Sequence, residues 1–360
     1  MTRPVVHIAG ARPNFPKLAP VMRGLAARGV PQTLVHTGQH YDDAMSDAFF
    51  RDLELPTPDV NLGVGSGSHG QQTAALLVAL EEALSALDPS LVLVYGDINS
   101  TLAAAITAAK LHLPLGHVEA GLRSFDMTMP EEVNRLVTDR LSDLLFVTSP
   151  EAIANLAREG AEPDSIHLVG NPMIDTLFRV REKLDVALAE DVLGRSGDYA
   201  VVTLHRPSNV DDPDDVGRLV GLLAATSQRL HVVFPVHPRG RGALAAAGLD
   251  ALDNLTVLDP LPYLSFVGLV SRAALVLTDS GGIQEESTML DVPCLTLRPN
   301  TERPITISHG TNRLVNPSTA LAAIDEIVAG TWVGATDRPP LWDGRAGERI
   351  AAIVALRLGA

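Results

Sequence analysis

The chain has 360 residues and a formal net charge of −15, and 46% of its residues are hydrophobic although only 4% are aromatic. This length exceeds that of a typical single domain and suits two domains, with cores built largely from Ala, Val and Leu. The negative charge argues against a nucleic-acid-binding surface, and no apolar run approaches the ~20 residues that a membrane-spanning helix needs. The N-terminal MTRPVVHIAGARPNFPK lacks the apolar region and cleavage site of a signal peptide, so we expect a soluble, cytoplasmic protein.

Short runs rich in β-branched residues alternate with amphipathic segments through the first half. The runs that read as strands are VVHIAG, QTLVHT, LVLVYGD, LGHVEAG and LLFVTS. Each is followed by a helix-like segment such as PKLAPVMRGLAARG or QQTAALLVALEEALSAL. Unbroken apolar strands between helices predict a parallel sheet covered on both faces.

The same alternation starts again after Asn171. A long helical segment is predicted from Met173 to about Leu193, and the strand-like runs that follow are YAVVTLH, LHVVFPVH, LTVLDP, ALVLTDSGG and PCLTLRP. The segment GERIAAIVALRL near the C-terminus predicts a final helix. We therefore predict an α/β protein with two Rossmann-like, doubly wound domains facing a cleft, one over 1–171 and one over 172–343.

Three acidic residues stand where predicted strands end or a helix begins. Asp97 comes after LVLVYG, Glu119 after LGHV, and Glu131 opens the helix-like PEEVNRLVTDRL. Because ligands bind at the carboxyl ends of parallel strands, we expect the three carboxylates to converge there. Clustered carboxylates raise one another's pKa and suit general acid and base catalysis. The structural alternative is that each acid only caps or decorates a helix N-terminus.

Metal binding is a competing explanation for these acids. Magnesium prefers carboxylate oxygens, but no tight Asp-x-Asp pair lies beside the predicted site, and the acid-rich 211–215 fits a solvated helix start. No His/Cys cluster has the spacing of a zinc site. The single cysteine, Cys294, lies in the strand-like VPCLTL and is expected to be a buried structural thiol. We therefore expect neither a metal nor another cofactor.

Two turns have the character of phosphate-binding sites. In the second half, Ser280, Gly281 and Gly282 open a helix whose unpaired N–H groups and dipole can receive a phosphate, and Glu286 lies one turn further on. A plain N-cap is the alternative for this segment. In the first half, GARPNFPK offers Arg12 and Lys17 as charge partners, against the alternative of a solvated helix start, and it matches neither the dinucleotide nor the P-loop pattern.

Two histidines follow strands of the second half. His205 precedes Arg206, and His237 lies in FPVHPR with Arg239. A histidine at a strand end is often structural. Two His/Arg pairs beside a phosphate-type turn in an acidic chain nevertheless favour binding of an anionic ligand.

An ordered set of motifs resembles the non-hydrolysing UDP-N-acetylglucosamine 2-epimerases. The set is GARPNFPKLAPV, TGQHYD, VYGDINST, GHVEAGLRS, MPEEVNR, VGNPMID, TLHRPSNV, FPVHPR, LTDSGGIQEE and TERP, over about Gly10 to Leu314. The resemblance implies a GT-B-type fold, a C-terminal helix at 344–360 that packs back on the first domain, and a homodimer. It also implies interconversion of UDP-N-acetylglucosamine and UDP-N-acetylmannosamine without metal or NAD, by elimination of UDP to 2-acetamidoglucal and its re-addition.

The resemblance also implies roles for single residues. Asp97 and Glu131 would handle protons, Glu119 would stabilise developing positive charge, and His205 would lie near the leaving phosphate. Phe266 would lie at the uracil, although simple core packing explains it equally well. The residues implied for substrate binding are Arg12, Lys17, Arg135, His237, Phe266, Ser280, Gly281, Gly282 and Glu286.

Some positions depart from the family pattern. Ala11 and Asn14 replace the usual threonine and glutamate, Pro207–Ser208 replaces Arg–Glu, and Tyr41–Asp42 follow Gln39–His40 where substrate-activated forms have Arg–Glu–Met. These departures weigh against a second, activating substrate site.

Other functions remain open alongside the epimerase. A hydrolysing relative would release UDP and free N-acetylmannosamine, a GT-B glycosyltransferase would use the acids to activate an acceptor hydroxyl, and a UDP-sugar sensor would bind without turnover. A UDP-sugar modified at C3 or C6 would fit the same uridine site.

Overall fold

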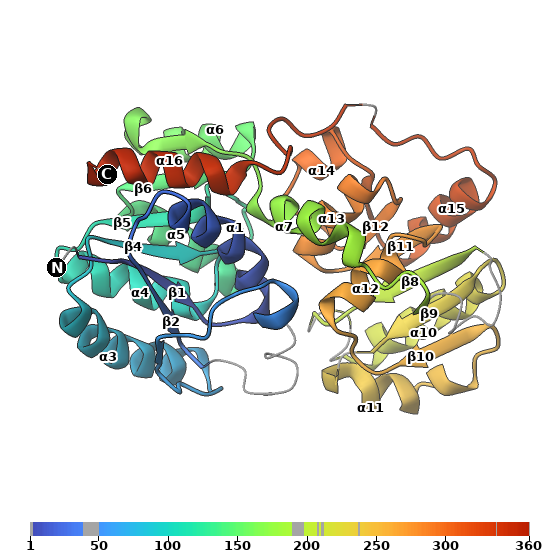
Figure 1. Cartoon of the computed structure of the whole chain (residues 1–360). Coiled ribbons are helices and arrows are strands. Elements are labelled where there is room, and N and C mark those ends of the chain that lie inside the picture. Colours follow the sequence, from blue (N-terminus) through green and yellow to red (C-terminus); the bar gives the residue numbers. More distant parts are fainter. Residues whose placement is uncertain are drawn as a thin grey trace. The chain divides into compact units, whose positions relative to one another are not determined.

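The chain folds into two compact α/β units. The structure is a computed structural model that describes residues 3–38, 50–188, 198–206, 209, 212–236, 238–335 and 337–359. The first unit comprises Met1–Val180 and Pro340–Ala360, and the second comprises Arg181–Pro339. Each contains a parallel sheet with helices on both faces (Figure 1), which confirms the predicted doubly wound α/β class.

The first unit is built on a parallel sheet that has seven strands within the described ranges. Its strand order is β3-β2-β1-β4-β5-β6-β7. The strands are β1 (Val5–Ala9), β2 (Gln32–His36), β3 (Val60–Asn61), β4 (Leu91–Tyr95), β5 (Leu115–Ala120), β6 (Leu144–Val147) and β7 (Ile166–Leu168). Every residue of the central strands β1, β4 and β5 is buried, as apolar runs covered by helices on both faces must be.

Seven longer helices and two short 3₁₀ helices of the described chain cover this sheet. They are η1 (Arg12–Asn14), α1 (Phe15–Ala26), α3 (His69–Leu87), α4 (Asn99–Lys110), α5 (Pro130–Leu141), α6 (Pro150–Arg158), η2 (Pro163–Ser165), α7 (Pro172–Val180) and α16 (Ala346–Leu358). Ser68 caps α3 and forms a reciprocal capping box with Gln71, which fixes the start of the helix at His69.

The second unit repeats the design with a sheet of six described strands in the order β10-β9-β8-β11-β12-β13. The strands are β8 (Tyr199–Thr203), β9 (His231–Pro235), β10 (Leu255–Leu258), β11 (Leu275–Thr278), β12 (Cys294–Leu297) and β13 (Asn312–Val315). The helical elements are η3 (Arg181–Lys183), α10 (Pro213–Ser227), α11 (Pro238–Ala246), η4 (Leu249–Ala251), α12 (Tyr263–Val270), α13 (Gly281–Leu290), α14 (Ile305–Ser308) and α15 (Pro317–Val328).

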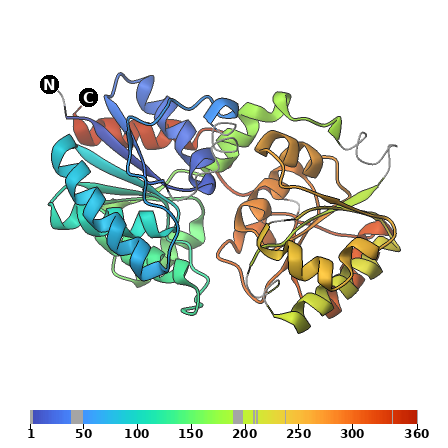
Figure 2. The ribbon, with the colours of Figure 1, turned by 90° about the horizontal axis from the view of Figure 1, so that it is seen from below.

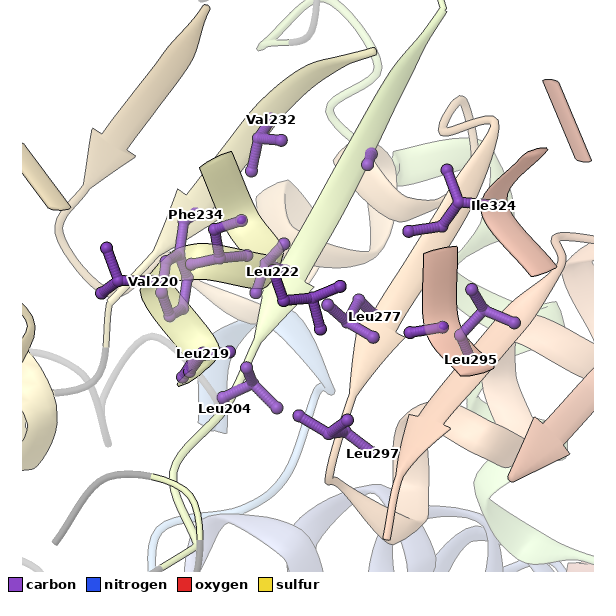
Figure 3. Packing of buried hydrophobic residues seen from close by; sticks show 14 of the residues in the cluster. Leu204, Leu219, Val220, Leu222, Val232, Phe234, Leu277, Leu295, Leu297 and Ile324 are labelled. Carbon is purple, nitrogen blue, oxygen red and sulfur yellow. The ribbon is translucent and has the colours of Figure 1, made fainter. Parts of the chain in front are cut away.

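Aliphatic side chains fill the core on one face of this second sheet. Leu277 and Leu295 from the strands meet Leu219 and Leu222 of α10 and Ile324 of α15 (Figure 3). All five are at least nine-tenths buried, and Phe234 is the one aromatic residue labelled in this view. The low aromatic content of the chain is therefore matched by a core of branched aliphatic residues.

The chain order of each sheet reverses direction next to its first strand. β1 lies between β2 and β4, and β8 lies between β9 and β11. The loops after these central strands leave in opposite directions and open a crevice at the carboxyl edge. Asp97 follows β4 and His205 follows β8, so these two predicted site residues stand at the two reversal points, and Asp279, which was not among the predicted site residues, follows β11.

The helix expected from Met173 to about Leu193 is shorter in the structure. Helix α7 ends at Val180, a 3₁₀ turn follows at Arg181–Lys183, and residues 184–186 are not helical. The first unit therefore extends beyond the expected boundary at Asn171, because α7 packs against α1 and belongs with it.

The C-terminal helix α16 lies along α1 in the first unit (Figure 2). Two glycines make this close approach possible. A Cβ on Gly24 of α1 would lie 2.7 Å from the carbonyl oxygen of Gly347, and a Cβ on Gly347 would lie 2.5 Å from the backbone of Pro20. The helices therefore meet backbone to backbone at this point.

A buried carboxylate on α7 holds the start of α16. Oδ1 of Asp175 accepts from the N–H of Ala346 at 3.1 Å, and Oδ2 accepts from the N–H of Gly347 at 2.7 Å. Burial raises the pKa of Asp175 to about 6, even though these two hydrogen bonds act to lower it. The interaction therefore caps α16 and joins it to the rest of the unit.

We predict that Asp175→Ala lowers the free energy of unfolding by about 1–2 kcal/mol at pH 7, because two helix N–H groups lose their acceptor. Asp175→Asn keeps one acceptor oxygen and should cost less. The folded protein binds the Asp175 proton more tightly than the unfolded chain does, so stability relative to the Asn variant should fall as pH rises towards and through about 6. Urea denaturation of the three proteins between about pH 4 and pH 7.5 measures both effects, and a parallel pH dependence of wild type and Asn variant would contradict the assignment.

Candidate active site

The carboxylate of Asp97 binds a buried arginine. Nη1 of Arg135 on α5 contacts Oδ2 of Asp97, and its Nη2 contacts Oε2 of Glu132, to which Nε donates at 3.0 Å. Arg135 is 2% exposed, whereas the side chain of Asp97 is 28% exposed. Asp97 does not cap the next helix, since the N-cap of α4 is Ile98 and has no side-chain cap bond. The buried guanidinium of Arg135 thus holds one oxygen of Asp97, while part of the Asp97 side chain stays accessible to solvent.

Glu132 anchors this arginine and was not among the predicted site residues. Its carboxylate also accepts from the backbone N–H and hydroxyl of Ser124, both at 3.0 Å, and from the N–H of Phe125 at 2.9 Å. Burial alone would raise the pKa of Glu132, but the hydrogen bonds from Ser124, Arg135 and Phe125 together hold it below its usual value. One sign of Glu132 was present in the sequence, namely that it directly follows the predicted site residue Glu131 after Pro130.

Glu119 lies at a break in the regularity of β5. The register of β5 against β6 shifts between Val118 and Ala120, and Glu119 has a positive φ of 77°. This left-handed conformation is unfavourable for a residue with a side chain and often marks a functional site. The carboxylate forms an ion pair with Nζ of Lys17 on α1, and both side chains are buried. Lys17, predicted to contact a phosphate, therefore pairs with one of the predicted acids.

The turn after β4 brings Glu119 close to the residue that precedes Asp97. A Cβ on Gly96 would lie 3.2 Å from Nζ of Lys17 and 3.3 Å from Oε2 of Glu119. Gly96 also has a positive φ of 63°, so both the space and the backbone favour glycine here. The carboxylate of Glu119 thus lies beside the residue that directly precedes Asp97.

Asn14 joins the first turn of the chain to this region. Its Oδ1 accepts from the N–H groups of Gly10 and Ala11, each at 3.2 Å, and its Nδ2 donates to the carbonyl of Tyr95 at 2.8 Å. Arg12 begins η1 in the same turn and is partly buried. The amide of Asn14 thus fixes the backbone beside Arg12 to the end of β4.

Glu131 stands in the first turn of α5, one residue after Pro130. Its side chain is partly exposed and makes no hydrogen bond or ion pair with any residue that the structure describes. Arg135 lies one helical turn further along α5 and contacts Asp97. The helix therefore carries both the open carboxylate of Glu131 and the guanidinium that holds Asp97.

In the second unit, His205 binds Asp279 at the two central strand ends. Nδ1 of His205 lies 2.9 Å from Oδ1 of Asp279, and the backbone N–H groups of His205 and Arg206 also donate to this carboxylate. Burial alone would raise the pKa of Asp279, but the bonds from His205, Arg206 and Asn209 hold it below its usual value. The imidazole is 45% exposed, so Asp279 orients a histidine that solvent and ligands can reach.

The predicted phosphate turn forms the N-terminus of α13. Ser280 is the N-cap residue but its side chain makes no cap hydrogen bond, so the plain-cap alternative does not describe it. Gly281 faces Arg303, because a Cβ at Gly281 would lie 2.4 Å from Nη1 of that arginine. Arg303 is buried beside Glu302 and Glu285. Exposed helix N–H groups with an arginine beside them suit an anionic ligand.

Further along α13, Glu286 is buried against an aromatic residue. Tyr263 Oη donates to its Oε1 at 2.7 Å. Burial raises the pKa of Glu286 to about 7; the bond from Tyr263 lowers it and the charge of Glu285 raises it. Phe266, on α12, packs partly buried against the core of this unit. His237 lies outside the described residues.

Other features of the described chain do not join these residues. No three His, Cys, Asp or Glu side chains within the described ranges are grouped as a metal ion requires. Cys294 is buried, and burial raises its pKa to about 11, as suits a structural thiol. A groove of about 1010 Å³ lies at the amino ends of β6 and β7, away from the strand ends that carry the acids. None of the described helices has the length and apolar character needed to cross a bilayer.

Comparison with known proteins identifies relatives over almost the whole chain. A sequence profile described as UDP-N-acetylglucosamine 2-epimerase matches residues 24–355. The UDP-N-acetylglucosamine 2-epimerase of Methanococcus maripaludis is 40% identical over 96% of this chain and 97% of its own. The UDP-2,3-diacetamido-2,3-dideoxy-D-glucuronate 2-epimerase of Pseudomonas aeruginosa is 41% identical over 98% and 99%.

A solved structure agrees with these relatives. The UDP-GlcNAc 2-epimerase of Methanocaldococcus jannaschii, in complex with UDP-GlcNAc and UDP, superposes with a TM-score of 0.89 at 38% identity, covering 98% of this chain and 99% of its own. At this coverage the match runs through both units. The chain belongs to the UDP-N-acetylglucosamine 2-epimerase family.

Proposed function

We propose that this protein interconverts UDP-N-acetylglucosamine and UDP-N-acetylmannosamine by eliminating UDP across C1–C2 and adding it back. The carrying observation is that Asp97 and Glu119, each paired with a cation, lie at the ends of the adjacent strands β4 and β5 in a chain of this family. In the elimination the C2 proton moves to a base while the C1–O bond breaks, which gives 2-acetamidoglucal and UDP. In the return step UDP attacks C1 and a proton is delivered to the other face of C2.

The accessibility of the three acids supports a division of labour. Asp97 and Glu131 are partly exposed, so they can exchange protons with a bound sugar. Glu119 is buried and paired with Lys17, so it supplies a fixed charge that can stabilise the oxocarbenium-like transition state. Arg135 serves here as the group that orients Asp97.

The second unit supplies groups suited to the UDP moiety. The N–H groups at Gly281 and Gly282 can bind phosphate oxygens, and Glu286 can accept from ribose hydroxyls. His205, oriented by Asp279, can donate to the phosphate that leaves and returns.

We predict that the wild-type enzyme, supplied with UDP-N-acetylglucosamine in deuterated water, forms product carrying deuterium at C2. Asp97→Asn and Glu131→Gln should each slow both turnover and deuterium incorporation by about 10²-fold or more, because each removes a proton-transfer group. Proton NMR follows substrate, product and exchange together.

Glu348→Gln is the matched control. Glu348 also lies in the first turn of a helix, α16, but is exposed and paired with Arg345 at the surface. This variant should keep the wild-type rate. Turnover without C2 exchange would rule out the elimination route, and release of free UDP in step with free sugar, followed by phosphorus NMR, would favour the hydrolysing alternative.

The sugar itself needs a direct comparison. The Pseudomonas aeruginosa relative is named for a UDP-sugar that is modified at C3 and C6. The C2 proton and the anomeric UDP that take part in the elimination are common to both sugars. We expect the higher kcat/KM on UDP-N-acetylglucosamine, and the reverse order measured under the same conditions would reassign the substrate.

We predict that the affinity for UDP falls about tenfold between pH 8 and pH 6 through the titration of Glu286. Its pKa is raised to about 7, and only the ionised carboxylate accepts from both ribose hydroxyls. Isothermal titration with UDP across this range measures the affinity. The pH dependence that remains in the Glu286→Gln variant reports the ionisation of UDP itself and is subtracted from that of the wild type.

Tyr263→Phe provides a second check on this assignment. Removing the hydroxyl takes away the hydrogen bond that lowers the pKa of Glu286, so the midpoint of the pH dependence should move upward. A midpoint that does not move, or a Gln variant with the full wild-type pH dependence, would contradict the role of Glu286.

A homodimer is part of the proposal, and light scattering of the purified protein measures it.

A further inference from the structure

A buried histidine and a buried aspartate connect the turns that follow β4 and β5. His117 on β5 is 0% exposed and Asp139 on α5 is 4% exposed. Nδ1 of His117 lies 2.6 Å from Oδ1 of Asp139, and its Nε2 lies 2.8 Å from the carbonyl oxygen of Gly96. The imidazole thus bridges Asp139 to the residue directly before Asp97.

Both ring nitrogens of His117 face acceptors. The carbonyl of Gly96 can only accept, so Nε2 carries a proton. Burial alone would raise the pKa of Asp139, but the charges and hydrogen bonds of His117 and Arg123 hold it below its usual value. An ionised carboxylate also only accepts. The ring of His117 therefore links two acceptors, the carboxylate of Asp139 and the carbonyl of Gly96.

The other oxygen of Asp139 reaches the turn after β5. Oδ2 accepts from the backbone N–H of Gly121 at 3.0 Å and lies 2.7 Å from Nη2 of Arg123. Arg123 in turn donates to Glu159 through Nε at 2.8 Å and Nη2 at 2.6 Å. One carboxylate therefore holds the turn after β5 directly and the turn after β4 through His117.

Glu119, near the end of β5, adopts a conformation that is unfavourable for a residue with a side chain, and Gly96, in the turn after β4, adopts one that glycine takes most readily. Gly96 and Glu119 have φ values of 63° and 77°, in the left-handed region. The N–H of Gly96 donates to the carbonyl of Val118 at 3.1 Å, so its peptide groups are bound on both sides by β5. Such conformations persist only where surrounding contacts hold them.

We propose that His117 and Asp139 are positioning residues for the epimerisation. They do not touch substrate; they hold the Gly96–Asp97 and Glu119–Gly121 turns so that the two catalytic carboxylates keep their mutual geometry. This inference rests on the proposed function of those carboxylates. A misplacement of about 1 Å lowers a rate by up to about 10²-fold, which sets the expected size of the effect.

The test compares His117→Asn and Asp139→Asn with a matched control. His117→Asn keeps an N–H near Asp139 but leaves the carbonyl of Gly96 without its donor, and Asp139→Asn keeps the shape but removes the charge. Both should lower kcat by about 10- to 100-fold with KM changed less than about threefold, because alignment and not ground-state binding is lost.

The control is His7→Asn. His7 is equally buried in the same sheet, on β1, with Nδ1 2.7 Å from Tyr95 Oη and Nε2 2.9 Å from Gln32 Oε1, so it contacts neither turn. His7→Asn should lower the melting temperature but leave kcat of the folded enzyme unchanged. Thermal melts and circular dichroism establish that each variant is folded before its rate is compared.

Nitrogen-15 NMR of the wild-type imidazoles gives a readout that does not depend on activity. Nε2 of His117 should carry a proton that is hydrogen-bonded to the carbonyl of Gly96, whereas His7, whose pKa is lowered to about 4 by burial, should appear neutral. A His117 ring without a proton on Nε2, an unchanged kcat in folded His117→Asn, or an equal loss of kcat in His7→Asn would overturn the positioning role. An inactive wild type would instead overturn the proposed function and leave the NMR result to stand by itself.

Discussion

The guanidinium of Arg135 lies between the carboxylates of Asp97 and Glu132 and is almost completely enclosed by protein. Removing one partner of such a buried pair generally costs about 3–5 kcal/mol, because a charge is left without compensation. The pairs Lys17–Glu119 and His117–Asp139 follow the same rule. Each buried carboxylate of this site therefore has to lie beside a cation. Asp97 and Glu131 are partly exposed, so their carboxylates can take part in proton transfer.

Much of the fold could be predicted because its central strands are unusual in sequence. β1, β4 and β5 are continuous apolar runs, which only a sheet covered on both faces accepts. The strands that the sequence did not reveal, β3, β7 and β13, lie at the ends of the sheets and are short or only partly buried, so no apolar run marks them. The long helix predicted from Met173 to about Leu193 ends at Val180 in the structure, and residues 184–186 are not helical, with the backbone of Asp185 against Gly268 of α12. Residues 189–193 of this prediction lie outside the described residues.

The sequence predicted where in the fold the candidate site residues lie, but not which residues they bind. Strand ends placed Asp97 and Glu119 together, since the carboxyl ends of neighbouring parallel strands must share an edge. Lys17, however, stands 102 positions before Glu119, and nothing in the spacing indicates that it binds this acid and not a phosphate. His117 read simply as part of a strand, and its role depends on which backbone carbonyl the folded sheet brings to its ring. Such pairings are decided by three-dimensional packing.

The positive φ of Glu119 also limits how this site can change by mutation. Glycine would relieve the local backbone by about 1–2 kcal/mol, so selection for folding alone would remove the carboxylate. Its loss, however, would strip the enclosed ammonium of Lys17 of its counter-charge, a larger penalty than the relief gained. Replacement of either residue alone is therefore unfavourable, and we expect Lys17 and Glu119 to be either both retained or both replaced in descendants of this chain.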